Sequence, residues 1–198
     1  DSQYRRELSY GRSEVWTVST DGQVRRLTPN PDYGYTNARY SPDGRWISFV
    51  SAPTRVASQR LFVVPVAGGA PVNLLGDWTY EPDGYEWLPS GQVGMSASVG
   101  GRTAYFMVDP QTRQLKEVLG GRRRLSGFST DKAGRQVAYV ATSMDRPTEL
   151  FVASTDGTGE RQVTRFNDEL RQQVAFSDAE RFTYKSTGGL EIEAWLMK

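Results

Sequence analysis

The sequence predicts an all-β protein that forms a segment of a β-propeller, and three observations support this prediction. Two short motifs recur in alternation along the chain, each with a period of about 45 residues, which lies in the range of propeller blades. The segments around them alternate apolar and polar side chains and are rich in the β-branched and aromatic residues that favour strands. No stretch of a dozen residues keeps a helical period, although residues 167–173 could form one short helical turn.

The first motif is a turn followed by a strand, and each copy carries a glycine at the same place. The glycines are Gly44, Gly91 and Gly134, which are spaced 47 and 43 residues apart. The sequence Pro-Asp-Gly suits a tight turn, because Asp bonds to the nearby backbone and glycine accepts a positive φ. The same reasoning assigns four recurring aspartates to turns rather than to a calcium site: Asp21, Asp43, Asp131 and Asp156.

The second motif is an apolar strand with an aromatic residue at its centre. Its copies centre on Trp16, Phe62, Phe106 and Phe151, which are 46, 44 and 45 residues apart. Because these aromatic residues repeat with the blade period, we predict that they pack between blades rather than bind a cofactor.

Strand counting divides residues 1–176 into propeller blades. Three complete blades, each with four strands, are predicted at residues 36–75, 84–119 and 124–165. Turn residues separate the strands within each of these ranges, which is the pattern of antiparallel strands joined by hairpins.

Incomplete pieces are expected at both ends of this series. Residues 14–28 are predicted to be the two outer strands of a partial blade, residues 173–176 one more inner strand, and residues 177–198 strands that leave the propeller. Two architectures fit: the terminal pieces close a four-bladed ring, or the chain is part of a larger ring. In the second case the open blade edges favour self-association, as a homo-oligomer, or a missing covalent partner.

Composition excludes several functional classes. The 198 residues include no Cys and no His, so the chain holds no disulfide, no Ser-His-Asp triad and no metal site built on those residues. A balance of 24 basic and 23 acidic side chains argues against a nucleic-acid partner, and no apolar run is long enough for a membrane span.

The stretch Gly94-Met-Ser-Ala-Ser98 lacks the second glycine of a nucleophile elbow, so Ser96 is predicted to be an ordinary strand residue. We expect no catalytic residue, cofactor or metal here, and the polar first residues give no cellular address.

The C-terminal part of the chain carries a family resemblance. The strings Leu150-Phe-Val-Ala-Ser-Thr-Asp-Gly and Glu180-Arg-Phe-Thr-Tyr-Lys-Ser-Thr-Gly-Gly-Leu-Glu-Ile-Glu-Ala-Trp-Leu-Met-Lys198 resemble the propeller-to-hydrolase junction of the prolyl oligopeptidase (S9) family, especially its acylaminoacyl-peptidase-like branch. Ala194 stands where that family commonly has glycine. The stretch Tyr40-Ser-Pro-Asp-Gly-Arg-Trp resembles a blade motif that the family shares with TolB-like propellers. The resemblance implies that the catalytic Ser, Asp and His belong to an α/β-hydrolase domain beyond Lys198.

Loop chemistry marks a candidate binding face. Because strand direction alternates within a blade, its loops divide between two ends, and one end carries longer loops with aromatic and basic side chains, where binding usually resides. These side chains are Tyr33, Tyr35, Arg55, Trp78, Tyr80, Arg122 and Arg123. The alternative is that the aromatic residues only cover blade edges and that the arginines of the run from Arg122 to Arg124 are solvated.

Three functions remain open at this stage. The resemblance implies a non-catalytic propeller domain that admits short peptides to the active site of a hydrolase domain in the same polypeptide. The alternatives are a TolB-like propeller that serves as a protein-binding scaffold and a closed four-bladed lectin-like or metal-binding module.

Overall fold

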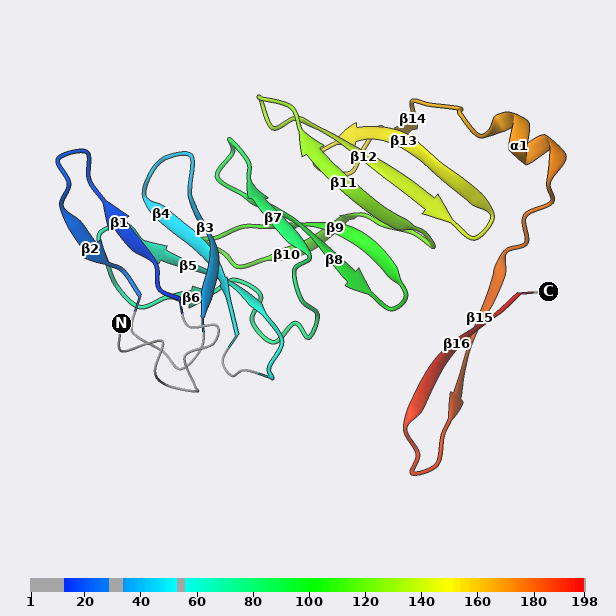
Figure 1. Ribbon diagram of the computed structural model, residues 1–198, viewed down its shortest axis with the longest axis horizontal. Helices are drawn as coiled ribbons and strands as arrows, with labels where there is room; N and C mark the ends of the chain where they lie inside the picture. The colour runs from blue at the N-terminus through cyan, green and yellow to red at the C-terminus, as the bar shows by residue number, and fades with distance from the viewer. Residues whose placement is uncertain (1–12, 29–33, 53–55, 198) are drawn as a thin grey trace.

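The computed structural model describes residues 13–28, 34–52 and 56–197, and three four-stranded antiparallel sheets form its body (Figure 1). The all-β prediction is confirmed. In the described residues the only α-helix is α1 (Asp168–Gln173), at the place where a short helical turn is predicted. That part of the chain contains no helix long and apolar enough to cross a membrane.

Each sheet is one propeller blade whose strands follow one another in sequence order. Blade I consists of β3 (Tyr35–Tyr40), β4 (Trp46–Ser51), β5 (Arg60–Pro65) and β6 (Val72–Asn73). Blade II consists of β7 (Gly84–Trp87), β8 (Val93–Val99), β9 (Arg102–Val108) and β10 (Leu115–Leu119). Blade III consists of β11 (Arg124–Thr130), β12 (Gln136–Ser143), β13 (Arg146–Ser154) and β14 (Arg161–Gln162).

Two hairpins flank the three blades. The pair β1 (Trp16–Val18) and β2 (Val24–Arg26) lies beside blade I, and the pair β15 (Ala179–Lys185) and β16 (Glu191–Met197) follows α1. Figure 1 shows the blue β1–β2 hairpin continuing the row of blades, whereas the orange and red β15–β16 hairpin lies apart from the row, beyond blade III.

The core lies between successive sheets rather than within any one of them. One apolar cluster joins the β1–β2 hairpin to blade I, a second joins blades I and II, and a third joins blades II and III. Strand β9 serves two of these clusters: Phe106 and Val108 point toward blade I, and Tyr105 and Met107 point toward blade III. Since successive side chains of a strand point to opposite faces, a strand between two clusters must carry consecutive apolar residues, as Ala-Tyr-Phe-Met-Val does at residues 104–108.

Aspartates close the turns at the end of the blades away from the long loops. In the turn after β3, the carboxylate of Asp43 accepts a hydrogen bond from the backbone N–H of Arg45 at 3.0 Å and one from the Ser41 hydroxyl at 2.6 Å. These bonds, led by the one from Ser41, lower the pKa of Asp43 to about 2. In the turn after β11, the carboxylate of Asp131 accepts backbone bonds at 2.6 and 2.8 Å. The aspartates therefore act in turns, as the sequence predicts.

Two sequence predictions differ from the structure at the ends of the row. Residues 174–176, predicted as part of an inner strand, form an irregular connection between α1 and β15, and Gln173 ends the helix. The described residues offer this segment no neighbouring strand with which to exchange backbone hydrogen bonds. Trp16, predicted to lie between blades, is 52% exposed, because the β1–β2 hairpin has no sheet on its outer side among the described residues.

We expect Leu61→Ala to lower the free energy of unfolding by about 2–5 kcal/mol, the usual cost of removing a fully buried leucine side chain. Leu61 is 0% exposed in the cluster between blades I and II. Urea denaturation provides the measurement. Leu190→Ala, at a leucine that is 67% exposed, is the matched control and should change the value by less than about 0.5 kcal/mol. Equal losses in the two variants would contradict the assignment of the core to the spaces between blades.

Candidate binding face

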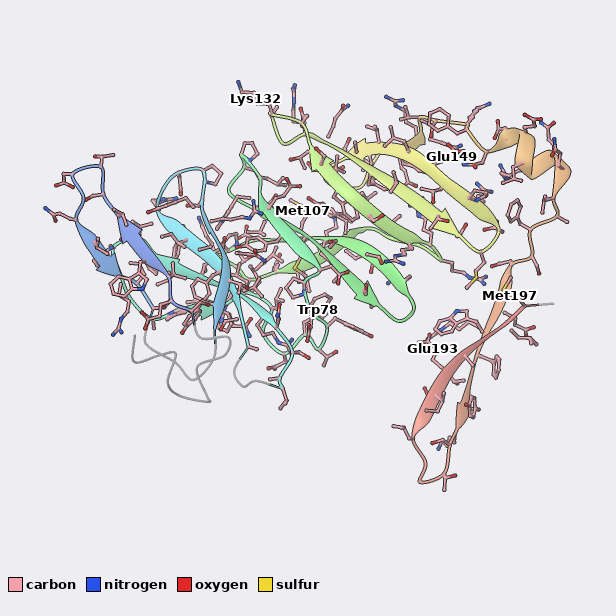
Figure 2. All side chains as sticks on the ribbon, viewed as in Figure 1. Trp78, Met107, Lys132, Glu149, Glu193 and Met197 are labelled. Carbon is pink, nitrogen blue, oxygen red and sulfur yellow. The ribbon has the colours of Figure 1, made fainter. Side chains whose placement is uncertain are left out.

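A cavity of about 1120 Å³ lies where the loop ends of blades II and III meet the β15–β16 hairpin. The long-loop end of the blades contributes Tyr80, the arginines 122–124 and the tight turn at Gly100 and Gly101. The hairpin contributes Ala179, Arg181 and Trp195. In Figure 2, Trp78 lies at the same end of the blades as the hairpin, and Lys132, in an aspartate turn, lies at the opposite end.

The structure brings three of the predicted binding residues together in this cavity, namely Tyr80, Arg122 and Arg123. Trp78, another predicted binding residue, packs between Tyr80 and the core. Its ring packs 5.1 Å from the ring of Phe106 in the core and 5.5 Å from that of Tyr80, which is 39% exposed. Trp78 therefore supports the wall of the cavity rather than lining it.

Tyr35, another of the predicted residues, does not join the cavity. Tyr35 is 7% exposed, and its ring makes an edge-on contact with Phe49 at 4.9 Å in the cluster that joins the β1–β2 hairpin to blade I. It is a core residue, because it begins an inner strand rather than ending a loop. Tyr33 and Arg55 lie outside the described residues.

Arg123 fastens the loop between blades II and III to blade III. Its guanidinium donates to the Gly120 carbonyl at 2.7 Å, pairs with Glu160 and lies 5.6 Å from the centre of the Phe151 ring. The buried Tyr139 hydroxyl donates to the same carboxylate, and its burial raises the pKa of that phenol. A side chain with so many partners holds a loop in place and has little freedom to turn toward a ligand.

Arg122 fastens the β15–β16 hairpin to the blades. Its guanidinium nitrogen lies 3.2 Å from a carboxylate oxygen of Asp178 and donates to the carbonyl of Ala179, the first residue of β15. Both charged side chains are more than half exposed, so this ion pair contributes little to stability by itself. Its effect is to position the hairpin over the loop.

A glycine allows a close contact between the hairpin and blade II. At Gly101, where φ is +74°, a Cβ atom would lie 2.3 Å from Cζ2 of Trp195, whereas at Gly100, where φ is +54°, it would meet nothing within 4 Å. Only a residue without a side chain lets the indole lie against this turn. The Trp195 ring thus closes one side of the cavity.

Glu149 orients the segment that leads from blade III to the hairpin. Its buried carboxylate accepts hydrogen bonds from the Thr164 hydroxyl, the Phe166 backbone N–H at 3.2 Å and the Asn167 backbone N–H at 2.8 Å. These bonds, led by the one from Thr164, lower the pKa of Glu149 from 4.5 to about 2. Figure 2 labels Glu149 on the part of blade III nearest α1.

A second cavity of about 500 Å³ lies against the inner strands of blades II and III. Glu86 is on its wall and accepts hydrogen bonds from the hydroxyls of Tyr105 at 3.3 Å and Thr130 at 3.1 Å, so the carboxylate links the two blades. Arg124 lines both this cavity and the larger one.

The described residues contain no catalytic constellation. Ser96 lies within strand β8, away from any strand-to-helix turn, and no group of three or more acidic residues is placed to hold a metal ion in the described part of the chain. The cavity can bind a ligand through its guanidinium, phenol and indole groups. It can also admit or exclude ligands by size.

Sequence reasoning missed Arg124, Asp178 and Trp195 as cavity residues. Arg124 is the last residue of an arginine run in the loop. The sequence pattern assigns it to the blade rather than to the binding face because it also begins a strand. Asp178 and Trp195 come from a hairpin whose position over blade II depends on contacts that no local pattern encodes.

The comparisons with known proteins agree with a propeller fold. No family model matches the sequence. The chain is 23% identical over 171 residues to dipeptidyl-peptidase 5 of Porphyromonas gingivalis. The aligned region covers 83% of this chain and 24% of that protein. The acylaminoacyl peptidase structure from Pyrococcus horikoshii matches with a TM-score of 0.73 and 22% identity over 93% of this chain and 28% of that one.

Two further solved structures match this chain. The β-propeller domain of the trilobed protease from Pyrococcus furiosus has a TM-score of 0.61 and 20% identity, covering 78% of this chain and 46% of that one. A putative TolB from Agrobacterium tumefaciens has a TM-score of 0.55 and 18% identity, covering 77% and 57%. The predicted likeness to prolyl oligopeptidase-type enzymes is thereby confirmed at the level of the propeller fold. The chain spans about a quarter of the length of dipeptidyl-peptidase 5 and of the acylaminoacyl peptidase.

We expect Gly101→Ala to displace Trp195 and to loosen the β15–β16 hairpin, which should appear as faster amide hydrogen exchange across residues 179–197. Gly100→Ala is the matched control. Both variants place a side chain at a positive φ, at a cost of about 1–2 kcal/mol, but only the first collides with the indole. Equal exchange rates in the two variants would contradict the role given to Gly101.

We expect Glu149→Gln to reduce stability at pH 7 and to flatten its acid dependence. In the wild type the folded-state pKa lies below the ordinary value, so the ionised carboxylate stabilises the fold above pH 4.5 and loses this effect as the pH falls toward about 2. Urea denaturation at a series of pH values measures this. Glu191→Gln, on the exposed start of β16, should keep the wild-type pH profile. A steep acid loss that persists in Glu149→Gln would show that another group causes it.

Proposed function

We propose that this chain is the non-catalytic propeller part of a serine peptidase of the prolyl oligopeptidase type, and that it restricts access to a hydrolase active site carried elsewhere in the same polypeptide. The observation that carries the proposal is the cavity between the blade loops and the β15–β16 hairpin. The sequence of this hairpin resembles the strands that lead into the hydrolase domain of that family.

The surface of the hairpin supports a covalently linked neighbour. Phe182, Tyr184 and Leu196 are each more than two-fifths exposed, and strand register places them on the same face, away from Trp195. An isolated two-stranded hairpin is marginally stable in water, so an apolar face of this kind calls for a covering structure. A domain that begins with these two strands would provide it.

The size of the cavity supports a steric gate. Pockets that bind drug-sized ligands have volumes of about 300–1,000 Å³. A space of about 1120 Å³ accommodates a short peptide and is too small to enclose a long polypeptide. The gate acts by size, because the described residues bring no reactive group to it.

A TolB-like scaffold is the second candidate function. The TolB match favours it, since that structure shares the fold over 77% of this chain. The acylaminoacyl peptidase match supports the peptidase instead, because it has the higher TM-score and extends over more of this chain.

The test compares the polypeptide that carries this chain with residues 1–198 alone. The carrier should hydrolyse short acylated peptides, be blocked by a serine-directed inhibitor and act at least tenfold more slowly on long unfolded substrates, a difference of about 1.4 kcal/mol in activation free energy. Residues 1–198 alone should be inactive. Gly101→Ala in the carrier should reduce the discrimination between long and short substrates, and Gly100→Ala should not.

Different outcomes reject different parts of the proposal. Inhibitor-sensitive hydrolysis by residues 1–198 alone would refute the non-catalytic assignment. Equal rates on long and short substrates would refute the gate. A carrier without any hydrolase activity would favour the scaffold.

A further inference from the structure

Arg124 lies between the two cavities of the described structure. It is the first residue of β11, the inner strand of blade III, and its exposed side chain lines both the larger cavity beneath the hairpin and the smaller one along the inner strands. Strand register places it directly across from Thr142, another residue of the larger cavity. The guanidinium therefore stands where the two spaces meet.

The other arginines around the larger cavity are neutralised by carboxylates. Arg102 makes two parallel bonds to Glu117, at 2.7 and 2.8 Å, and Arg122 pairs with Asp178. Arg123 pairs with Glu160, and Arg181 pairs with Glu193. In this way four guanidinium groups are engaged in holding loops and strands.

The guanidinium of Arg124 makes no hydrogen bond or ion pair with any residue in the described ranges 13–28, 34–52 and 56–197. Among the cavity arginines, it is thus the one whose donors have no partner in the part of the chain that the structure describes. A guanidinium offers donors in a planar fork that matches a carboxylate in two parallel hydrogen bonds, and it keeps its charge at every physiological pH. A partly enclosed cavity strengthens such a bond relative to open water.

We infer that Arg124 binds a carboxylate of a peptide that enters the larger cavity, and so favours peptides that present a negative charge at that point. The identity of the ligand as a peptide rests on the proposed function, whereas the preference for a carboxylate rests on the unpaired guanidinium. The carboxylate is either the C-terminus of the peptide or an acidic side chain. Both sources present the same planar group to the fork, so only experiment separates them.

The experiment titrates the 198-residue chain with four tetrapeptides and measures Kd by isothermal calorimetry. The first pair has the sequence Ala-Ala-Phe-Ala with an acetylated N-terminus and either a free carboxylate or an amide at the C-terminus. The second pair is amidated and has Glu or Gln in place of the final alanine. A peptide with a carboxylate should bind more tightly than its neutral partner by about five- to tenfold, as expected for charge-assisted hydrogen bonds. The pair that shows the difference identifies the source of the carboxylate.

Variants of arginine assign the effect to one residue. Arg124→Gln should remove the preference for the carboxylate and leave the Kd of the neutral peptides unchanged, and Arg124→Lys should restore part of it, because lysine keeps the charge but not the fork. Arg161→Gln is the matched control, since Arg161 is also an exposed strand residue but lies on the outermost strand of blade III. Circular dichroism verifies that each variant is folded.

The outcomes separate this inference from the proposed function. Equal Kd values for charged and neutral peptides, or equal losses in Arg124→Gln and Arg161→Gln, would overturn the inference even if the carrier polypeptide is an active peptidase. Loss of the carboxylate preference in Arg124→Gln alone would support the inference even if the carrier hydrolyses nothing, in which case only the proposed function fails.

Discussion

Burial of apolar surface between neighbouring sheets is the constraint on which the rest of this structure depends. A four-stranded blade has two faces, and its central strands are apolar on both, so no blade can bury its own core. Strand β9 shows this most clearly, because its consecutive residues Tyr105, Phe106, Met107 and Val108 alternate between two separate clusters. Stability therefore comes from a continuous stack, and the ring of Trp16 is exposed because no further sheet of the described structure covers its face.

The polar side chains act on this stack in a different way. Aspartates such as Asp43 and Asp131 close the turns at one end with local hydrogen bonds. At the other end, Arg123 and Glu149 use charge to hold connections that run between elements, and each has three or more partners. These bonds determine where the cavity lies. The loop that bears Arg122 and the segment that leads to Trp195 both start from positions that such bonds hold in place.

The charged groups around the cavity divide into those that hold the structure in place and those that are free to contact a ligand. Most charged groups around the cavity are paired and serve to maintain its shape, and in the functions proposed above recognition falls to Arg124 and to the exposed ring of Tyr80. A chain without histidine can contribute shape, charge and a route of entry to a reaction, and in the proposed function the general base belongs to the hydrolase domain.

The sequence by itself determined the blade architecture, because the two motifs repeat with one period and because alternation along strands and the aspartate turns are local properties. It also identified the end of the blades at which Tyr80, Arg122 and Arg123 lie. Only the tertiary structure decided that Tyr35 belongs to the core, that residues 174–176 form a connection, and that Trp195 rests on Gly101. The physical reason is that burial, strand pairing and ion pairing at these positions depend on partners far along the chain, and a periodic pattern specifies a face without specifying what packs against it.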